Sequence, residues 1–182
     1  MKKLYTYALI ASLLFVSCSD DDDPVAVNEE EVITTMIVTL VPSDASTNIT
    51  LKTQDLDGDG PNAPVVTVSG NLKASLTYAG SVKFLNETET PAEDITEEVE
   101  EEDTDHQVFY TVGSPLLMNV VSTNNDSDGN PLGTKFKIDG ISSAGSGKLT
   151  FTLRHEPKKP NTGLTDAGGS TDLEATFDIV VE

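Results

Sequence analysis

Residues 173–181, Leu-Glu-Ala-Thr-Phe-Asp-Ile-Val-Val, place an apolar side chain at every second position. Glu174, Thr176 and Asp178 stand between the apolar residues, which is the pattern of a β-strand with one buried face. The same pattern returns in four earlier stretches, at 49–54, 76–84, 135–138 and 148–153. Less regular runs at 32–41, 65–68, 107–112 and 116–122 bring the prediction to about nine strands.

Turn-forming residues separate these runs, among them Asp57-Gly58, Asp139-Gly140 and Gly168-Gly169. Short strands punctuated at this spacing are typical of two packed antiparallel sheets and not of a parallel α/β sheet. The sequence therefore predicts a mainly β protein, an antiparallel immunoglobulin-like β-sandwich over residues 32–182, with one short acidic helix.

The helix is predicted from residue 90 to about Asp103. Thr90 is the expected N-cap, Pro91 the first helical residue, and Glu93 completes a capping box. Ile95 and Val99 form its only apolar stripe. Because many acidic residues stand four apart, we expect the helix to be stable only if it docks on the sheets or binds a cation.

The N-terminus predicts an exported lipoprotein. Residues 1–17 read as a signal peptide, with Lys2 and Lys3 before an apolar run. Cys18 follows as the expected lipidation site, and because it is the only cysteine, an intramolecular disulfide is excluded. Residues 18–31 are predicted to be an acidic tether. We therefore expect a protein held in the cell outer membrane by its lipid alone.

The charge balance limits the partners. The chain of 182 residues carries 31 acidic and 11 basic side chains, a formal charge of −20. So acidic a protein cannot neutralise phosphates, which argues against nucleic acid and against direct attraction to anionic lipid.

One candidate cation site is the loop that contains Asp55, Asp57 and Asp59. With Gly60 these residues match positions one, three, five and six of an EF-hand calcium loop, but Val66 stands where a bidentate glutamate is expected. A weaker copy lies at 124–129. Two interpretations stay open for these loops, namely calcium binding and Asp-Gly turns between strands.

The other candidate joins the only two histidines, His106 and His155, to Glu156. If the acidic helix packs over the end of the strand that reaches His155, these three residues form a two-histidine, one-carboxylate site suited to zinc or another transition metal. The alternative is a buried or capping His155 with a solvated His106. The sequence has no Gly-x-Ser-x-Gly, no phosphate-binding glycine-rich turn and no His-Glu-x-x-His, so we do not expect an enzyme.

Several segments together resemble a family of small flavobacterial (Bacteroidota) lipoproteins often labelled "type 1 periplasmic binding fold superfamily protein". The resemblance lies in residues 18–23, 28–35, 55–68, 91–107 and 153–161. It implies that the acidic tether after Cys18 serves export to the cell surface, the alternative being a plain hydrophilic spacer. The label implies a two-lobed α/β fold, whereas the strand pattern predicts a β-sandwich.

Taken together, these features predict a surface-exposed outer-membrane lipoprotein. We expect a ligand-binding accessory module that holds a metal ion, calcium or zinc, or another small ligand for an envelope transporter. The alternative is a structural or adhesive spacer domain without a small ligand.

Overall fold

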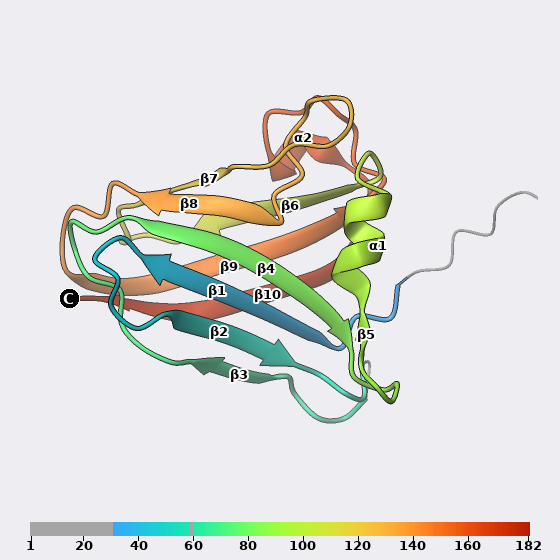
Figure 1. Ribbon diagram of the computed structural model, residues 1–182, viewed down its shortest axis with the longest axis horizontal. Coiled ribbons are helices and arrows are strands. Elements are labelled where there is room, and N and C mark those ends of the chain that lie inside the picture. Colours follow the sequence, from blue (N-terminus) through green and yellow to red (C-terminus); the bar gives the residue numbers. More distant parts are fainter. Residues whose placement is uncertain (1–30, 59) are drawn as a thin grey trace, which may run out of the picture.

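Ten strands and two short helices make up the part of the chain described in the computed structural model, residues 31–182 apart from residue 59 (Figure 1). The strands are β1 (Thr35–Pro42), β2 (Ile49–Gln54), β3 (Val65–Val68), β4 (Tyr78–Asn86), β5 (Glu93–Asp94), β6 (His106–Val112), β7 (Asn119–Ser122), β8 (Lys135–Asp139), β9 (Gly145–His155) and β10 (Ser170–Val181). The helices are α1 (Ile95–Glu101) and α2 (Leu164–Ala167). Signal peptide, Cys18 and most of the predicted tether lie outside the described residues.

The strands form two antiparallel sheets. One has the order β3-β2-β1-β4-β8-β7, with the short β5 paired to β4, and the other has the order β10-β9-β6. All named strand pairs are antiparallel. The prediction of a mainly β, antiparallel two-sheet protein is confirmed. The immunoglobulin-like assignment stays a prediction.

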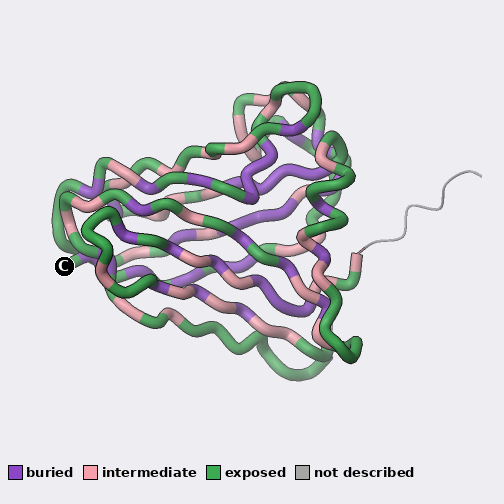
Figure 2. The backbone as a smooth tube through the Cα atoms, viewed as in Figure 1, coloured by how far each residue is buried: buried purple, intermediate pink, exposed green. Residues whose placement is uncertain are grey.

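The core lies where the inner faces of the two sheets meet. Along β10 the side chains from residue 175 to residue 181 alternate between buried and exposed, as the sequence predicts, and Figure 2 shows similar alternation along other strands. Phe136 of one sheet packs against Phe151 of the other, with ring centroids 5.5 Å apart. Burying one such side chain contributes about 1.5–3 kcal/mol, so the paired apolar faces hold the sheets together.

The predicted helix start is wrong. Glu93 and Asp94 are paired with β4 as β5, and α1 begins only at Ile95, with the Asp94 carboxylate accepting a hydrogen bond from the backbone N–H of Thr96. Asp94 therefore caps the helix in place of Thr90. Ile95 and Val99 are buried, as predicted, so docking offsets the repulsion between its acidic side chains. The chain also has a second helix, α2, which the sequence did not predict.

Segments from distant parts of the chain meet at one end of the two sheets. Helix α1 lies there, beside the start of β6, the end of β9 and the first described residues (Figure 1). Within the described residues, no helix is both long enough and apolar enough to cross a bilayer.

Candidate metal centre

Four side chains from distant parts of the chain converge at the α1 end of the protein. Their potential ligand atoms all lie within 4.8 Å of one another. The side chains are 5% exposed or less. The members of this four-residue cluster are Glu31, His106, His155 and Asp172.

The two histidines meet because of strand register. β6 and β9 run antiparallel with His106 directly opposite His155, and their imidazole rings stack with centroids 4.7 Å apart. Residues that face each other across an antiparallel pair bring their side chains close together. The structure thus places the two predicted histidines side by side. The alternative of a solvated His106 is wrong, because this side chain is fully buried.

Glu31 contributes a carboxylate from just before β1. Its Oε1 lies 2.8 Å from His106 Nε2, and its Oε2 lies 3.8 Å from His155 Nδ1. The sequence assigned this residue to the solvated tether, because nothing in the composition separates Glu31 from the acidic residues that precede it. Only the fold, which brings the start of β1 to this end, places Glu31 in the cluster.

Asp172 reaches the cluster through an irregularity in β10. Thr171 pairs with Arg154 and Leu173 with Leu153, so Asp172 is the extra residue of a β-bulge. A bulge turns the following side chains relative to regular alternation. Here it brings Asp172 Oδ1 to 3.9 Å from His155 Nδ1. In the sequence, the sign of this bulge is that the alternation of apolar and polar residues begins only at residue 173. That sign alone does not predict a bulge.

Glu156, the predicted carboxylate ligand, lies outside the cluster and is exposed. Neighbouring residues of a strand face opposite sides, so the residue after an inward-facing His155 is directed away. In addition, the backbone turns at Glu156, which has a φ of 48° and donates its N–H to the Asp105 carbonyl.

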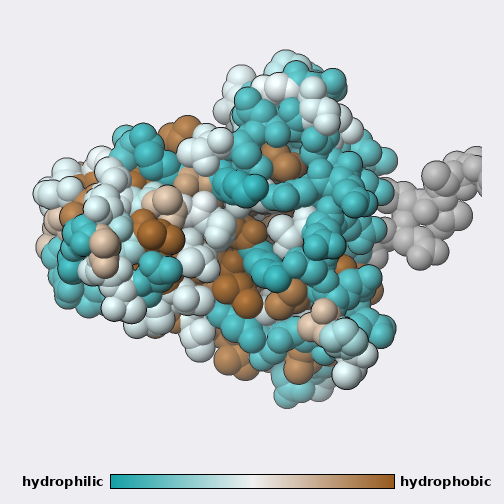
Figure 3. Space-filling view, viewed as in Figure 1, coloured by the Kyte–Doolittle hydropathy of each residue, from teal (hydrophilic) through white to brown (hydrophobic). Residues whose placement is uncertain are grey.

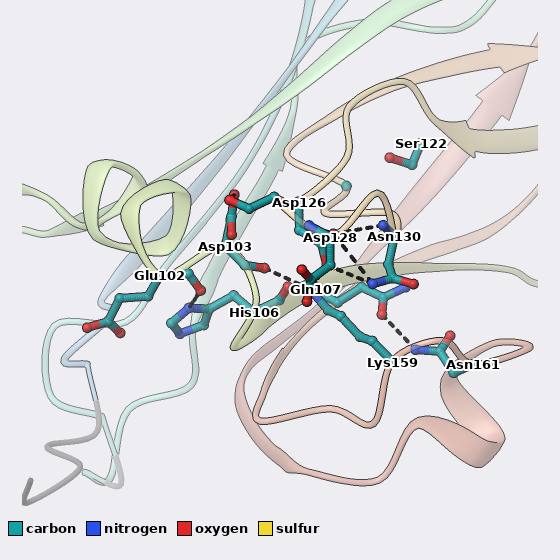
Figure 4. Close-up of polar contacts among 12 residues, drawn as sticks. Glu102, Asp103, His106, Gln107, Ser122, Asp126, Asp128, Asn130, Lys159 and Asn161 are labelled. Carbon is teal, nitrogen blue, oxygen red and sulfur yellow. Dashed lines mark hydrogen bonds and ion pairs between the residues drawn. The ribbon is translucent and has the colours of Figure 1, made fainter.

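His106 is held by one hydrogen bond at its imidazole ring and one at its backbone carbonyl. Its Nδ1 lies 3.1 Å from the Glu102 carbonyl oxygen, at the end of α1, as Figure 4 shows. When Nδ1–H donates to that carbonyl, the lone pair of Nε2 faces the cluster, which is the arrangement of many metal-bound histidines. The His106 backbone carbonyl accepts a hydrogen bond of 2.6 Å from Lys159 Nζ.

Three atoms of the cluster are buried and have no hydrogen-bond partner among the described residues. These atoms are Glu31 Oε2, His106 Nε2 and His155 Nδ1. Glu31 Oε1 lies 2.8 Å from His106 Nε2, but the two groups are not aligned as a hydrogen bond. Buried polar atoms are nearly always satisfied, so such a group of them signals a ligand.

The surroundings of the cluster are negative. Burial, followed by the nearby carboxylates of Glu31, Glu102 and Glu93, raises the pKa of Glu98 on α1. The buried carboxylates of Glu31 and Asp172 add to this field, and burying negative charge is costly. A divalent cation bound between them would remove that cost.

The described carboxylates of the Asp55 loop do not converge in the way that the ligands of the four-residue cluster do. Asp57 Oδ2 accepts hydrogen bonds from the backbone and side-chain nitrogens of Asn62, and Asp55 Oδ1 accepts from the Asp57 N–H. The bonds from Asn62 lower the pKa of Asp57. Within the described part of the loop, the carboxylates thus serve turn geometry and form no group of three converging ligands. Asp59 lies outside the described residues.

In the second candidate loop, at 124–129, the buried carboxylate is paired with a lysine. Asp126 is buried and accepts hydrogen bonds from the N–H groups of Asp128 and Asn130 and from Lys159 Nζ, the last at 2.9 Å (Figure 4). A lysine ammonium therefore occupies the position where a calcium ion would have to bind.

No family model, curated protein or solved structure matches this chain at a significant level. The functional argument therefore depends on the geometry of the chain itself.

Proposed function

We propose that this protein is a lipid-anchored β-sandwich module of the outer membrane that binds a divalent transition-metal ion in the four-residue cluster. The observation that carries the proposal is the convergence of two imidazoles and two carboxylates in a buried place. Zinc is the first candidate metal because it takes such nitrogen and oxygen ligands in a tetrahedral arrangement.

The separations within the cluster support this proposal. With ligand bonds of roughly 2.0–2.1 Å, neighbouring ligand atoms of a tetrahedral zinc site lie about 3.3 Å apart. Three of the separations, 2.8, 3.8 and 3.9 Å, lie on either side of this value, and all four ligand atoms lie within 4.8 Å of one another. Small side-chain movements would therefore complete a site, with His106 supplying Nε2 and His155 supplying Nδ1.

The anchoring part of the proposal comes from the sequence. Lys2 and Lys3, the apolar run and Cys18 support export and lipidation, and the acidic residues after Cys18 support display at the surface. A Cys18→Ala chain should lose lipid labelling and leave the membrane fraction. Retained membrane anchoring of that variant would contradict the lipoprotein proposal.

Metal binding is tested with the full-length chain, purified without chelator, stripped of metal and titrated with zinc by calorimetry and native mass spectrometry. We expect one zinc ion per chain. Zinc at about 100 times its Kd should stabilise the fold by about 2.7 kcal/mol.

Variants assign the zinc to the cluster. His155→Ala and Asp172→Asn should each weaken zinc binding at least tenfold, whereas Glu156→Ala, which alters an exposed neighbour, should bind like the wild type. Asp172→Asn keeps the shape of the side chain and serves if His155→Ala fails to fold, which circular dichroism will show. No bound zinc in the wild type would contradict the proposal and favour the spacer alternative. Equal zinc affinity in all variants would contradict the assignment of zinc to the four-residue cluster.

A further inference from the structure

A cleft of about 730 Å³ opens beside the four-residue cluster. Glu31 and Asp172 belong both to the cluster and to the wall of the cleft. The cleft therefore adjoins the buried cluster at two of its four residues. Glu31 Oε2, a buried atom without a hydrogen-bond partner among the described residues, belongs to a side chain in this wall.

The wall of this cleft is acidic. Five carboxylates line it, and no lysine, arginine or histidine is among the described residues that do so. The carboxylates belong to Glu31, Asp55, Asp57, Asp172 and Glu174. More broadly, Figure 3 shows hydrophilic side chains gathered over α1 and the neighbouring loops. A cleft lined by one sign of charge concentrates ions of the opposite sign and raises their association rates.

Asp55 and Asp57, like Glu174, belong to this wall but not to the cluster. Both side chains are held by hydrogen bonds, Asp57 by those from Asn62 and Asp55 by that from the Asp57 N–H. Both carboxylates belong to the wall of the cleft without being members of the cluster, and so they can attract a cation without ligating it in its final position.

We propose that the cluster is loaded through this cleft with the hydrated divalent cation itself, which Asp55 and Asp57 attract, and that anionic metal chelates are excluded. This inference rests on the proposed metal-binding function and adds the form in which the metal arrives. The size of the cleft exceeds that of a bare ion, which leaves room for the cation's water shell. An anionic chelate would meet five carboxylates.

The test measures how fast cobalt(II) binds to the full-length, metal-free chain, followed by its visible absorbance in a stopped-flow instrument. The double variant Asp55→Asn/Asp57→Asn keeps the hydrogen-bond acceptors of the loop and removes two charges. At low ionic strength we expect its association rate to fall about fivefold, within the range of electrostatic steering. In 0.5 M salt the difference should disappear because the charges are screened.

The matched control, Asp139→Asn/Asp178→Asn, removes one half-buried and one exposed charge, which are ion-paired to Lys137 and Lys148 far along the strands. It should bind at close to the wild-type rate. The dissociation rate of cobalt, measured by a chelator chase, should be the same in all three proteins. A variant that had lost structure would instead release cobalt at a different rate.

The outcomes separate the two proposals. An association rate unchanged by Asp55→Asn/Asp57→Asn, or lowered equally by the control, would overturn the loading inference while metal binding stands. A rate that follows total cobalt and not free cobalt when citrate is present would also overturn it, because anionic chelates would then be accepted. If the wild type shows no absorbance change, the metal-binding function fails and the loading inference fails with it.

Discussion

At the scale of single residues, Lys159 stabilises the end of the protein that carries the cluster. Its ammonium group is 6% exposed and donates to the Asp103 carbonyl, the His106 carbonyl and the Asp126 carboxylate. These three bonds use all three donors of a lysine. One side chain thus joins the turn after α1, the start of β6 and the loop between β7 and β8.

Replacing Lys159 should lower the free energy of unfolding substantially. Lys159→Met leaves the Asp126 carboxylate buried without its cation, and breaking a buried pair in this way costs roughly 3–5 kcal/mol of the free energy of unfolding. Lys158→Met, a change at the exposed neighbouring residue, should stay within about 0.5 kcal/mol of the wild type. Urea unfolding measures both values, and similar stabilities for the two variants would contradict this role of Lys159.

The Asp126–Lys159 pair also predicts a pH dependence. Burial raises the pKa of Asp126, but the hydrogen bonds from Lys159 and Asn130 outweigh burial and hold the pKa below its ordinary value of 3.8. A carboxyl whose pKa is lowered by folding contributes stability above its unfolded pKa and loses it as the pH falls through the folded pKa.

Below about pH 4, the free energy of unfolding should therefore fall more steeply in the wild type than in Asp126→Asn. Urea unfolding between pH 5 and pH 2.5 gives both slopes, and the other acidic groups are common to the two proteins. Parallel curves for the two proteins would show that Asp126 does not contribute.

At the scale of elements, the positions of the strands can be predicted from the sequence, but the conformation of the segments at their ends cannot. Alternation located β2, β9 and β10 and their buried faces, because each inward position must be apolar to form the core. The start of α1 was misplaced because Thr90 and Pro91 match a helix start locally, whereas pairing of Glu93 and Asp94 with β4 keeps that segment extended. Pairing between distant segments is not visible in a local pattern.

The same limit applies to the candidate site. The sequence singled out His106 and His155 because they are the only histidines, and it predicted that they meet only if the acidic helix packs over the strand end that carries His155. It missed Glu31 and Asp172, because one resembles tether and the other depends on a bulge. It selected Glu156 by adjacency, although alternation directs that residue to the other side.

A pair of glycines tests how the turn before β10 supports the site. Gly168 and Gly169 both have positive φ, 64° and 72°. A Cβ on Gly169 would lie 2.2 Å from the His155 carbonyl oxygen, whereas a Cβ on Gly168 meets nothing within 4 Å. Gly168→Ala therefore meets no steric clash and carries only the strain of a backbone conformation, φ 64° and ψ −148°, that is open essentially to glycine, roughly 1–3 kcal/mol.

Gly169→Ala should lose more stability than Gly168→Ala and should also weaken zinc binding, because the backbone at His155 must move. Thermal unfolding with and without zinc compares the two variants. Equal melting temperatures and equal zinc affinities would contradict this account of the turn.

At the scale of the whole molecule, two antiparallel sheets bring four ligand candidates from widely separated positions to one end. Residue 31 precedes the first strand, His106 begins β6, His155 ends β9 and Asp172 lies in the bulge of β10. The strand that leads from the proposed membrane tether therefore begins beside the cluster. The acidic cleft lies beside the same end, so the proposed tether, the proposed access route and the proposed metal site share one region of the protein.

The most direct test of the central claim is anomalous diffraction at the zinc absorption edge from crystals of the protein grown with zinc. We predict one strong peak within bonding distance of His106 Nε2 and His155 Nδ1, with the carboxylates of Glu31 and Asp172 completing the site. Zinc-saturated crystals with no peak between the two histidines, or with a peak only at the Asp55 loop, would contradict the claim.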